Sequence, residues 1–191
     1  MSLHSNKICT VIIAGGRGNR MQGQDKGLLE WQGKPMIEHI LSSLSDEYQP
    51  IMINANRNIE RYRQYGHDVI TDTYENYQGP LVGILSAMQH CTQEYILCIP
   101  CDSPQLPQDL LPRLKQCLAQ HDATGAICYD GKRTQPLFAL LACSLQTELK
   151  AFLDSGNRKV HSFFESINAA VCDFSDQPEC FHNFNTPDDM Q

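Results

Sequence analysis

Residues 8–13 form an almost unbroken apolar run, Ile-Cys-Thr-Val-Ile-Ile, and a glycine-rich stretch from Gly15 to Gly27 follows at once. A strand without polar alternation has to be covered on both faces, which is typical of parallel sheets in α/β proteins. Further apolar runs stand at 51–53, 69–70 and 95–99, and they alternate with segments of helical periodicity. The pattern predicts an α/β fold with a largely parallel sheet.

The helical segments and the later strands complete this prediction. A helix that Pro35 opens has one apolar face, formed by Ile37, Ile40, Leu41 and Leu44. Further helices are expected near 58–65, 81–88, 110–118 and 145–152, and later strands at 126–128, 137–141 and 170–174. The segment 130–133, Asp-Gly-Lys-Arg, has the composition of a hairpin turn, so one late strand should run antiparallel. We predict a single Rossmann-like, three-layer α/β/α domain over residues 1–191, with residues 1–7 disordered.

Composition excludes several classes of protein. The 191 residues are enough for one sizeable core, and the formal net charge of −7 makes nucleic acid a poor partner. No apolar run approaches the roughly 18 residues that cross a bilayer, and the polar start of the chain resembles no secretory signal. Nine cysteines, several of them inside apolar runs, are expected to be free thiols in a reducing compartment. We therefore expect a cytoplasmic protein that does not bind membranes.

Polar residues and glycines follow several of the predicted strands. Ala14-Gly15-Gly16 comes after the first strand, Asn54 and Asn56 after the second, Asp72 after the third, and Asp102 after the fourth. Open α/β sheets bind their ligands beyond the carboxyl ends of the strands. We therefore expect these residues to converge on one rim of the sheet.

The glycine-rich stretch is the strongest local feature. Glycine allows successive N–H groups to point at phosphate oxygens, and Arg17, Arg20 and Lys26 add positive charge that suits a polyphosphate. Two familiar phosphate loops do not fit, because Met21 stands where a Rossmann fingerprint needs its third glycine and Gln24 where a Walker loop needs lysine. The alternative interpretation is a plain surface turn.

Other candidate residues carry more than one interpretation. Asp102 ends a buried strand between prolines, where it either holds Mg²⁺ against a phosphate or caps a turn. Arg133 and Arg158 either contact a second anionic substrate or belong to a solvated surface. Cys98 and Cys101 have C-x-x-C spacing, but no second pair exists and Cys98 lies inside a strand, so a metal or redox role is disfavoured.

These motifs resemble a known family. The segments 13–16, 20–21, 25–29 and 33–35 resemble the opening of the sugar-nucleotide and cofactor nucleotidyltransferases. Four further segments, at 54–57, 79–84, 100–104 and 183–189, narrow the resemblance to the bacterial molybdenum cofactor guanylyltransferases. The similarity runs from about Ile8 to the C-terminus. Gln135 stands where that family usually has histidine, and Arg158-Lys159 where it has two arginines.

The resemblance implies an activity and a set of roles. That family transfers GMP from Mg-GTP to the terminal phosphate of molybdopterin and releases pyrophosphate. It implies Mg²⁺ as cofactor, GTP and molybdopterin as substrates, and transient contact with cofactor-insertion proteins. Lys26, Asp102 and Arg20 would be catalytic, and Asp102 would also hold the metal. The nucleotide would contact Ile13, Ala14, Gly15, Gly16, Lys26, Asn54, Asp72, Gly79 and Asp102. The pterin would contact Asn183, Asn185, Arg133 and Arg158.

Two alternatives stay open. A cytidylyltransferase acting on the same cofactor tends to read Ala-Ala-Gly at 14–16, and a side chain at position 15 would narrow the base site, whereas Gly15 leaves room for a purine. A GTP-binding adaptor without catalysis, acting in cofactor delivery, belongs to a different class. The presence of both Lys26 and Asp102 favours an enzyme.

Overall fold

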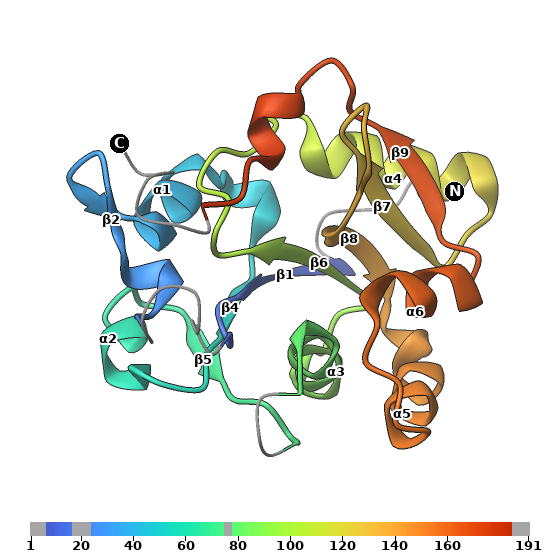
Figure 1. Ribbon diagram of the computed structural model, residues 1–191, viewed down its shortest axis with the longest axis horizontal. Coiled ribbons are helices and arrows are strands. Elements are labelled where there is room, and N and C mark those ends of the chain that lie inside the picture. The colour runs from blue at the N-terminus through green and yellow to red at the C-terminus, as the bar shows by residue number, and fades with distance from the viewer. Residues whose placement is uncertain (1–6, 17–23, 75–77, 185–191) are drawn as a thin grey trace.

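Seven strands form one sheet in the computed structural model, which describes residues 7–16, 24–74 and 78–184 (Figure 1). They are β1 (Ile8–Ile13), β4 (Ile51–Asn54), β5 (Asp68–Ile70), β6 (Tyr95–Pro100), β7 (Gly125–Tyr129), β8 (Thr134–Ala142) and β9 (Ala170–Asp173). Their order across the sheet is β5-β4-β1-β6-β8-β7-β9. Every neighbouring pair is parallel except the two that include β8, which runs antiparallel to both β6 and β7.

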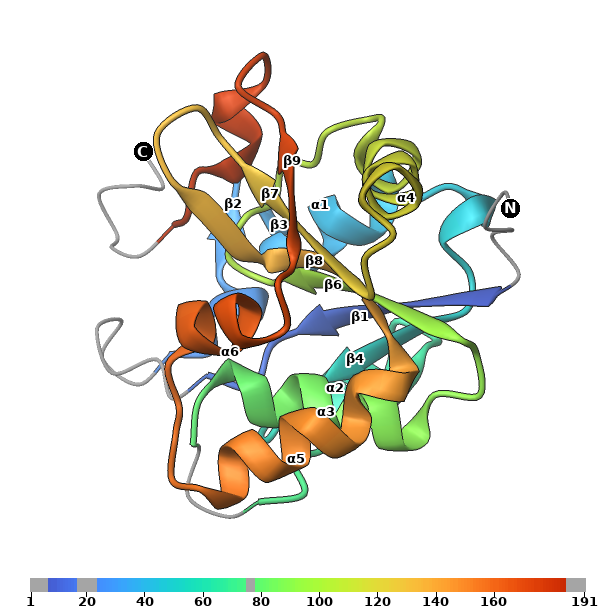
Figure 2. The same cartoon turned by 90° about the vertical axis from the view of Figure 1, so that its right-hand side faces the viewer.

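Helices cover both faces of the sheet (Figures 1 and 2). One face packs against α1 (Met36–Ser43), α2 (Ile59–Arg63) and α4 (Leu110–His121), and the other against α3 (Pro80–His90), α5 (Gln146–Asp154) and α6 (Val160–Ser166). Strand β1 explains this division, because Ile8 and Ile12 belong to the first apolar cluster and Cys9, Val11 and Ile13 to the second. All six residues of β1 are buried. At about 1.5–3 kcal/mol for each large apolar side chain, burial on both faces fixes the strand at the centre.

The predicted three-layer α/β/α fold is confirmed, including its late antiparallel strand. Each predicted strand and helix is present within a few residues of its expected bounds. Apart from 3₁₀-helices, two features of the fold were not predicted. One is α6, and the other is a separate hairpin of β2 (Glu30–Trp31) and β3 (Lys34–Pro35), whose turn residues Gln32 and Gly33 both have positive φ. The predicted disorder of residues 1–7 falls, apart from Lys7, outside the described residues.

Short 3₁₀-helices complete the chain: η3 (Lys26–Leu28), η4 (Asp46–Tyr48), η5 (Cys143–Leu145) and η6 (Pro178–Phe181). Over the described ranges, no helix combines the length and the apolar character needed to cross a membrane.

The predicted hairpin turn at 130–133 joins β7 to β8. The backbone N–H of Asp130 donates to the carbonyl oxygen of Arg133 at 3.1 Å, and Gly131 takes a positive φ of 89°. The Asp130 carboxylate accepts the backbone N–H groups of Lys132 and Arg133, each at 2.8 Å, and the side-chain amide of Gln135 at 2.6 Å. Burial alone would raise the pKa of Asp130, but these donors outweigh it and lower the pKa below the usual 3.8.

We expect Asp130→Ala to lower the free energy of unfolding by about 1–2 kcal/mol at pH 7, because three donors lose their acceptor. A carboxyl with a depressed pKa stabilises the fold above its unfolded pKa, and that stability is lost as the pH falls through the folded-state pKa. The difference between wild type and variant should therefore shrink below pH 3.8. Urea unfolding across this range measures it, with Glu165→Ala on the exposed side of α6 as control. A stability difference between wild type and Asp130→Ala that does not change with pH would contradict the role assigned to the Asp130 carboxylate.

Candidate active site

The ends of four parallel strands lie side by side, since β5, β4, β1 and β6 are neighbours in that order. Asn54 is the last residue of β4, Asp72 follows β5, and Asp102 follows β6. Backbone hydrogen bonds join these ends to the segment after β1: Ala14 N–H donates to Asn54 O at 2.8 Å, and Cys101 N–H to Ile13 O at 3.1 Å. The predicted convergence on one rim is present in the structure.

Asp72 is the centre of a hydrogen-bond network between three of these strand ends. Its carboxylate accepts Asn54 Nδ2 at 3.0 Å and Asn56 Nδ2 at 2.7 Å, and its backbone N–H donates to Asn56 Oδ1 at 2.8 Å. Asn56 Nδ2 also donates to the carbonyl oxygen of Gly15 at 3.1 Å. Burial raises the pKa of Asp72, and the hydrogen bonds from the two asparagines oppose that rise. The network fixes the positions of the loops after β1, β4 and β5.

Asn54 presents a buried acceptor to this rim. Its side chain is only 1% exposed, and its Nδ2 donates to Asp72, which orients the amide. Within the described part of the chain, Asn54 Oδ1 is buried and accepts no hydrogen bond. A buried acceptor without a donor costs about 1–3 kcal/mol. Gly15 and Gly83 lie close to this oxygen.

Two glycines make room for the asparagine side chains. A Cβ at Gly83, in the first turns of α3, would lie 2.3 Å from Asn54 Oδ1. A Cβ at Gly15 would lie 2.8 Å from Asn56 Nδ2 and 2.9 Å from Asn54 Oδ1. The structure gives Gly15 a role different from the one expected. The space beside it is filled by two side chains, so its lack of a Cβ is not evidence of extra room for a purine.

Lys26 and Asp102 form an ion pair at the same rim, with Lys26 Nζ 2.9 Å from Asp102 Oδ2. Each side chain is 21% exposed, so both charges stay accessible to a ligand while being partly desolvated. An ammonium group and a carboxylate in this position suit a phosphate and a divalent cation, respectively.

Asp25 holds the backbone next to Lys26, a role that sequence reasoning missed. Its buried carboxylate accepts the hydroxyl of Tyr62 at 2.6 Å and Asn58 Nδ2 at 3.0 Å, and Arg57 Nε lies 3.8 Å away. A Cβ at Gly27 would lie 2.6 Å from the Tyr62 hydroxyl. The only sequence signal for this network was the pair Asp25-Lys26, because its partners on and before α2 are distant in sequence.

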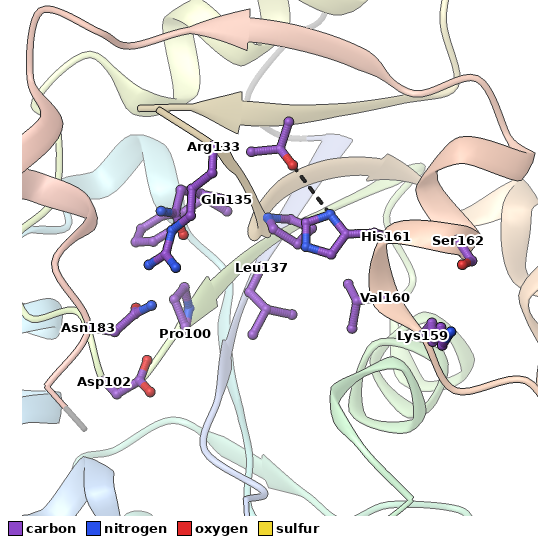
Figure 3. A pocket seen from close by; sticks show the side chains of 13 residues that line it. Pro100, Asp102, Arg133, Gln135, Leu137, Lys159, Val160, His161, Ser162 and Asn183 are labelled. Carbon is purple, nitrogen blue, oxygen red and sulfur yellow. Dashed lines mark hydrogen bonds between the residues drawn. The ribbon is translucent and has the colours of Figure 1, made fainter. Parts of the chain in front are cut away.

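A pocket of about 450 Å³ opens beside Asp102 (Figure 3). Figure 3 shows Arg133, Asn183 and Asp102 along one side of it, and His161 and Val160 from α6 on the other. Its lining is Pro100, Asp102, Arg133, Thr134, Gln135, Pro136, Leu137, Phe138, Lys159, Val160, His161, Ser162 and Asn183. The side chains of Arg133 and Lys159, on opposite sides of the pocket (Figure 3), give it cationic groups that suit an anionic ligand.

Three contacts fix the walls of this pocket. Ser103 Oγ donates to Asn183 Oδ1 at 2.7 Å, and the backbone N–H of Phe184 donates to Asp102 O at 2.8 Å, so the late segment is tied to the loop after β6. Across the pocket, Thr134 Oγ1 and His161 Nδ1 are 3.3 Å apart. Lys159 and His161 were not predicted, because the sequence pattern of α6 was not recognised.

The structure places Arg158 outside the lining of this pocket and beside Gln78, the residue before Gly79. Its guanidinium donates to Gln78 Oε1 and to the carbonyl oxygens of Leu153 and Asn157, and it does not line the pocket. Gly79 stands at the N-terminus of α3 with a φ of +100°, which a residue with a side chain rarely adopts. Ile13 and Ala14 are buried at the end of β1. A Cβ added at Gly16, which follows them, would have no atom of the described residues within 4 Å, its chain neighbours aside. Arg20 and Asn185 lie outside the described residues.

The C-x-x-C pair lies inside the fold. Cys98 and Cys101 are both buried, and burial raises the pKa of each thiol. Both are therefore protonated, unreactive thiols at neutral pH.

A family model described as the MobA-like NTP transferase domain matches residues 10–171. The chain belongs to this family. It is 46% identical over 187 residues to the molybdenum cofactor guanylyltransferase of Shewanella sediminis (strain HAW-EB3), and 44% identical over 187 residues to that of Shewanella loihica (strain ATCC BAA-1088 / PV-4). Each alignment covers 98% of this chain and 95% of the relative.

A solved structure shares the fold of this MobA-like NTP transferase. It is the molybdopterin-guanine dinucleotide biosynthesis protein A from Archaeoglobus fulgidus, with a TM-score of 0.79 and 24% identity, covering 95% of this chain and 94% of that one. The range matched by the family model contains Asn54, Asp72, the Lys26–Asp102 pair and the β7–β8 hairpin. Asn183 lies beyond it. The residues at the rim therefore belong to a nucleotidyltransferase.

We expect Gly83→Ala to weaken nucleotide binding by tenfold or more, a loss of about 1.4 kcal/mol, because its Cβ would displace Asn54 from the rim. Alanine is a better helix former than glycine by about 1 kcal/mol, so a loss of helix propensity cannot account for the effect. Calorimetric titration with nucleotide measures the affinity, and Gln89→Ala on the exposed side of α3 is the matched control. Wild-type affinity in Gly83→Ala would show that Asn54 does not shape the nucleotide site.

Proposed function

We propose that this nucleotidyltransferase transfers GMP from GTP to the terminal phosphate of molybdopterin and releases pyrophosphate. The names of the most similar relatives support guanine rather than cytosine as the base. The observation that carries the proposal is the Lys26–Asp102 pair, which adjoins the asparagine and Asp72 network on one side and the cationic pocket on the other. A donor nucleotide and an anionic acceptor can therefore meet at one pair of charged groups.

The nucleoside half of GTP is assigned to the ends of β1, β4 and β5. Asn54 Oδ1 offers a buried acceptor, and Asp72 is held by two asparagine donors. We assign Ile13, Ala14, Gly15, Gly16 and Gly79, which stand at or near strand and helix ends, to this half as well. The N–H groups of the segment after β1 and the ammonium group of Lys26 are assigned to the phosphates. Arg20 is assigned to the phosphates by the family resemblance alone.

Asp102 fits a Mg²⁺ ion that binds together with the nucleotide. Mg²⁺ takes one or two carboxylates and completes its shell with water and phosphate oxygens. Nowhere in the described ranges do three or more His, Cys, Asp or Glu side chains gather as metal ligands, so a site built by the protein alone is not seen there. When bound, the ion would neutralise charge on the phosphate oxygens and on the leaving pyrophosphate.

The acceptor half is assigned to the pocket beyond Asp102. Arg133 and Asn183 line it and face the same opening (Figure 3). Lys159 and His161 line it as well, and we add them to the residues assigned to the pterin. The attacking group is a phosphate oxygen that is already anionic, so no strong general base is needed. The protein then has to align the two substrates and stabilise the charge that develops, and we assign these tasks to Lys26 and Arg133. Asn185 and Arg158 remain candidates from the resemblance.

We expect Asp102→Asn to lower kcat for pyrophosphate release by about 10²-fold or more, because the carboxylate that holds the metal is lost. The amide is nearly isosteric, and the hydrogen bond from Phe184 goes to the backbone oxygen of Asp102, so the fold should persist. The matched control is Asp109→Asn, a half-exposed carboxylate further along the same loop. Turnover with Mg-GTP and molybdopterin is the measurement. Unchanged turnover in Asp102→Asn would refute the metal assignment.

Nucleotide titrations separate the remaining candidates. Mg-GTP should bind at least about tenfold more tightly than CTP or ATP. Tighter binding of CTP than of GTP would assign the protein to the cytidylyltransferases, and its assignment as a nucleotidyltransferase would stand. Binding of Mg-GTP without pyrophosphate release when molybdopterin is supplied would instead support a non-catalytic adaptor.

A further inference from the structure

Strand β8 is irregular near its start, where it borders the pocket beside Asp102. Two consecutive residues of β7 pair with Ala139 and Gln135 of β8, so residues 136–138 between them form a bulge. The pairing of β8 with β6 also stops at Ala139, although β6 continues as far as Pro100. Pro100 and the bulge both line the pocket, which therefore lies where the two strands part.

The bulge brings consecutive side chains of β8 to one cavity. Successive residues of a regular strand point to opposite faces of a sheet, whereas residues 133–138 all line the pocket. Bulges re-aim side chains in this way beside functional sites. Gln135 is the buried polar residue of this run, with only 6% of its surface exposed. A polar side chain that is more than nine-tenths buried therefore forms part of the pocket wall.

Asp130 determines which atom of the Gln135 amide is left for a ligand. Gln135 Nε2 donates to Asp130 Oδ2 at 2.6 Å, while the backbone N–H groups of Lys132 and Arg133 donate to Asp130 Oδ1. Burial opposes ionisation of this carboxyl, but the donors keep its pKa below the usual value. An ionised carboxylate only accepts hydrogen bonds, so the group that faces it is the NH₂ of the amide. Gln135 Oε1 therefore points away from Asp130.

Gln135 Oε1 is available to a ligand in the pocket. Across residues 7–16, 24–74 and 78–184, the bond to Asp130 is the one hydrogen bond of this side chain. A largely buried amide oxygen gains from a donor, because a desolvated acceptor without one costs free energy. The pocket is the space from which that donor can come.

We propose that Gln135 is a specificity-determining residue of the acceptor pocket, whose side-chain oxygen accepts an N–H group from the amino-pyrimidinone edge of a pterin. The inference rests on the proposed function. Figure 3 shows Gln135 and Asp102 at opposite ends of one pocket wall, with Asn183 between them. In molybdopterin, the amino-pyrimidinone edge lies at the opposite end of the fused rings from the terminal phosphate. A phosphate beside Asp102 therefore directs this edge toward Gln135.

The chemistry of this edge matches a fixed acceptor. Its exocyclic amino group and the adjacent ring N–H are both donors. A ring with an oxygen in place of the amino group would bring a second acceptor against Gln135 Oε1, and Asp130 prevents the amide from turning over to offer its NH₂. A site built for one hydrogen bond rejects an analogue that lacks it, because the buried partner is left unpaired.

Gln135→Met tests the proposal, because methionine has a similar length and no acceptor oxygen. The KM for molybdopterin should rise about tenfold, while kcat and the KM for GTP stay within about twofold of wild type, since the lost contact affects binding of one substrate. Pyrophosphate release is the measurement. The matched control is Lys132→Ala in the same turn, whose exposed side chain does not line the pocket and whose backbone N–H still donates to Asp130.

Gln135→Lys separates recognition of the ligand from support of the turn. Its ammonium group can still donate to Asp130 but offers no acceptor, so the KM for molybdopterin should rise at least as much as in Gln135→Met. A wild-type KM in Gln135→Lys would show that the side chain only holds the turn, and would overturn the proposal. Urea unfolding of both variants checks the fold, and either one alone gives a result if the other unfolds.

Two inhibitors test the chemistry of the ligand. Pterin-6-carboxylate carries the amino group, and lumazine-6-carboxylate has an oxygen in its place. Against molybdopterin, wild type should bind the pterin at least about tenfold more tightly, and Gln135→Met should reduce this preference to within about twofold. Equal inhibition of wild type by the two compounds would overturn the assignment to the amino-pyrimidinone edge.

The same assays distinguish this inference from the proposed function. A wild-type protein that releases no pyrophosphate from Mg-GTP and molybdopterin would remove both. Normal turnover by wild type together with an unchanged KM for molybdopterin in Gln135→Met would remove the role of Gln135 alone.

Discussion

Burial of β1 on both faces is the constraint on which the rest of the structure depends. Because both sets of its alternating side chains are covered, helices pack above and below it, and its neighbours β4 and β6 are parallel strands reached by crossovers. Parallel neighbours end at the same edge. Asn54, Gly15 and Asp102 therefore lie at one edge of the sheet, although they are far apart in the sequence.

The rim is held by polar contacts that act between loops. Asp72 collects hydrogen bonds from Asn54 and Asn56, and Asp25 collects them from Asn58 and Tyr62. Each carboxylate is partly or wholly buried, so its partners keep it satisfied in a region of low dielectric. One network orders the part of the rim that we assign to the nucleoside, and the other orders the backbone that presents Lys26. Preorganisation of this kind reduces what a ligand has to rearrange on binding.

The sequence predicted the elements of the fold and the rim residues because both depend on periodicity and on strand ends. It did not predict α6, since its short stripe of Val160, Phe163 and Phe164 is only two turns long. The pocket residues Lys159 and His161 were missed for the same reason. Arg158 was selected for its charge. In the structure, hydrogen bonds to Gln78 and to the carbonyl oxygen of Leu153 fix where its guanidinium points, and such contacts cannot be inferred from the sequence alone. The missing side chain at Gly15 was interpreted as room for the base of the nucleotide. In the structure, the side chains of Asn54 and Asn56 lie in the space beside it.

The reversed direction of β8 divides the site into two parts that can change independently. Because β8 runs against β6, it starts at the edge where β6 ends, and the turn at 130–133 brings Arg133 and Gln135 to that edge. The side that we assign to the nucleotide is built from the ends of parallel strands, whose crossovers are in the two helical layers. The side that we assign to the acceptor includes a surface turn and the start of a strand, where residues can be inserted or exchanged without moving β1, β4 or β5. A fold of this kind can keep the same nucleotide as donor substrate and acquire new acceptor substrates through changes in a single hairpin.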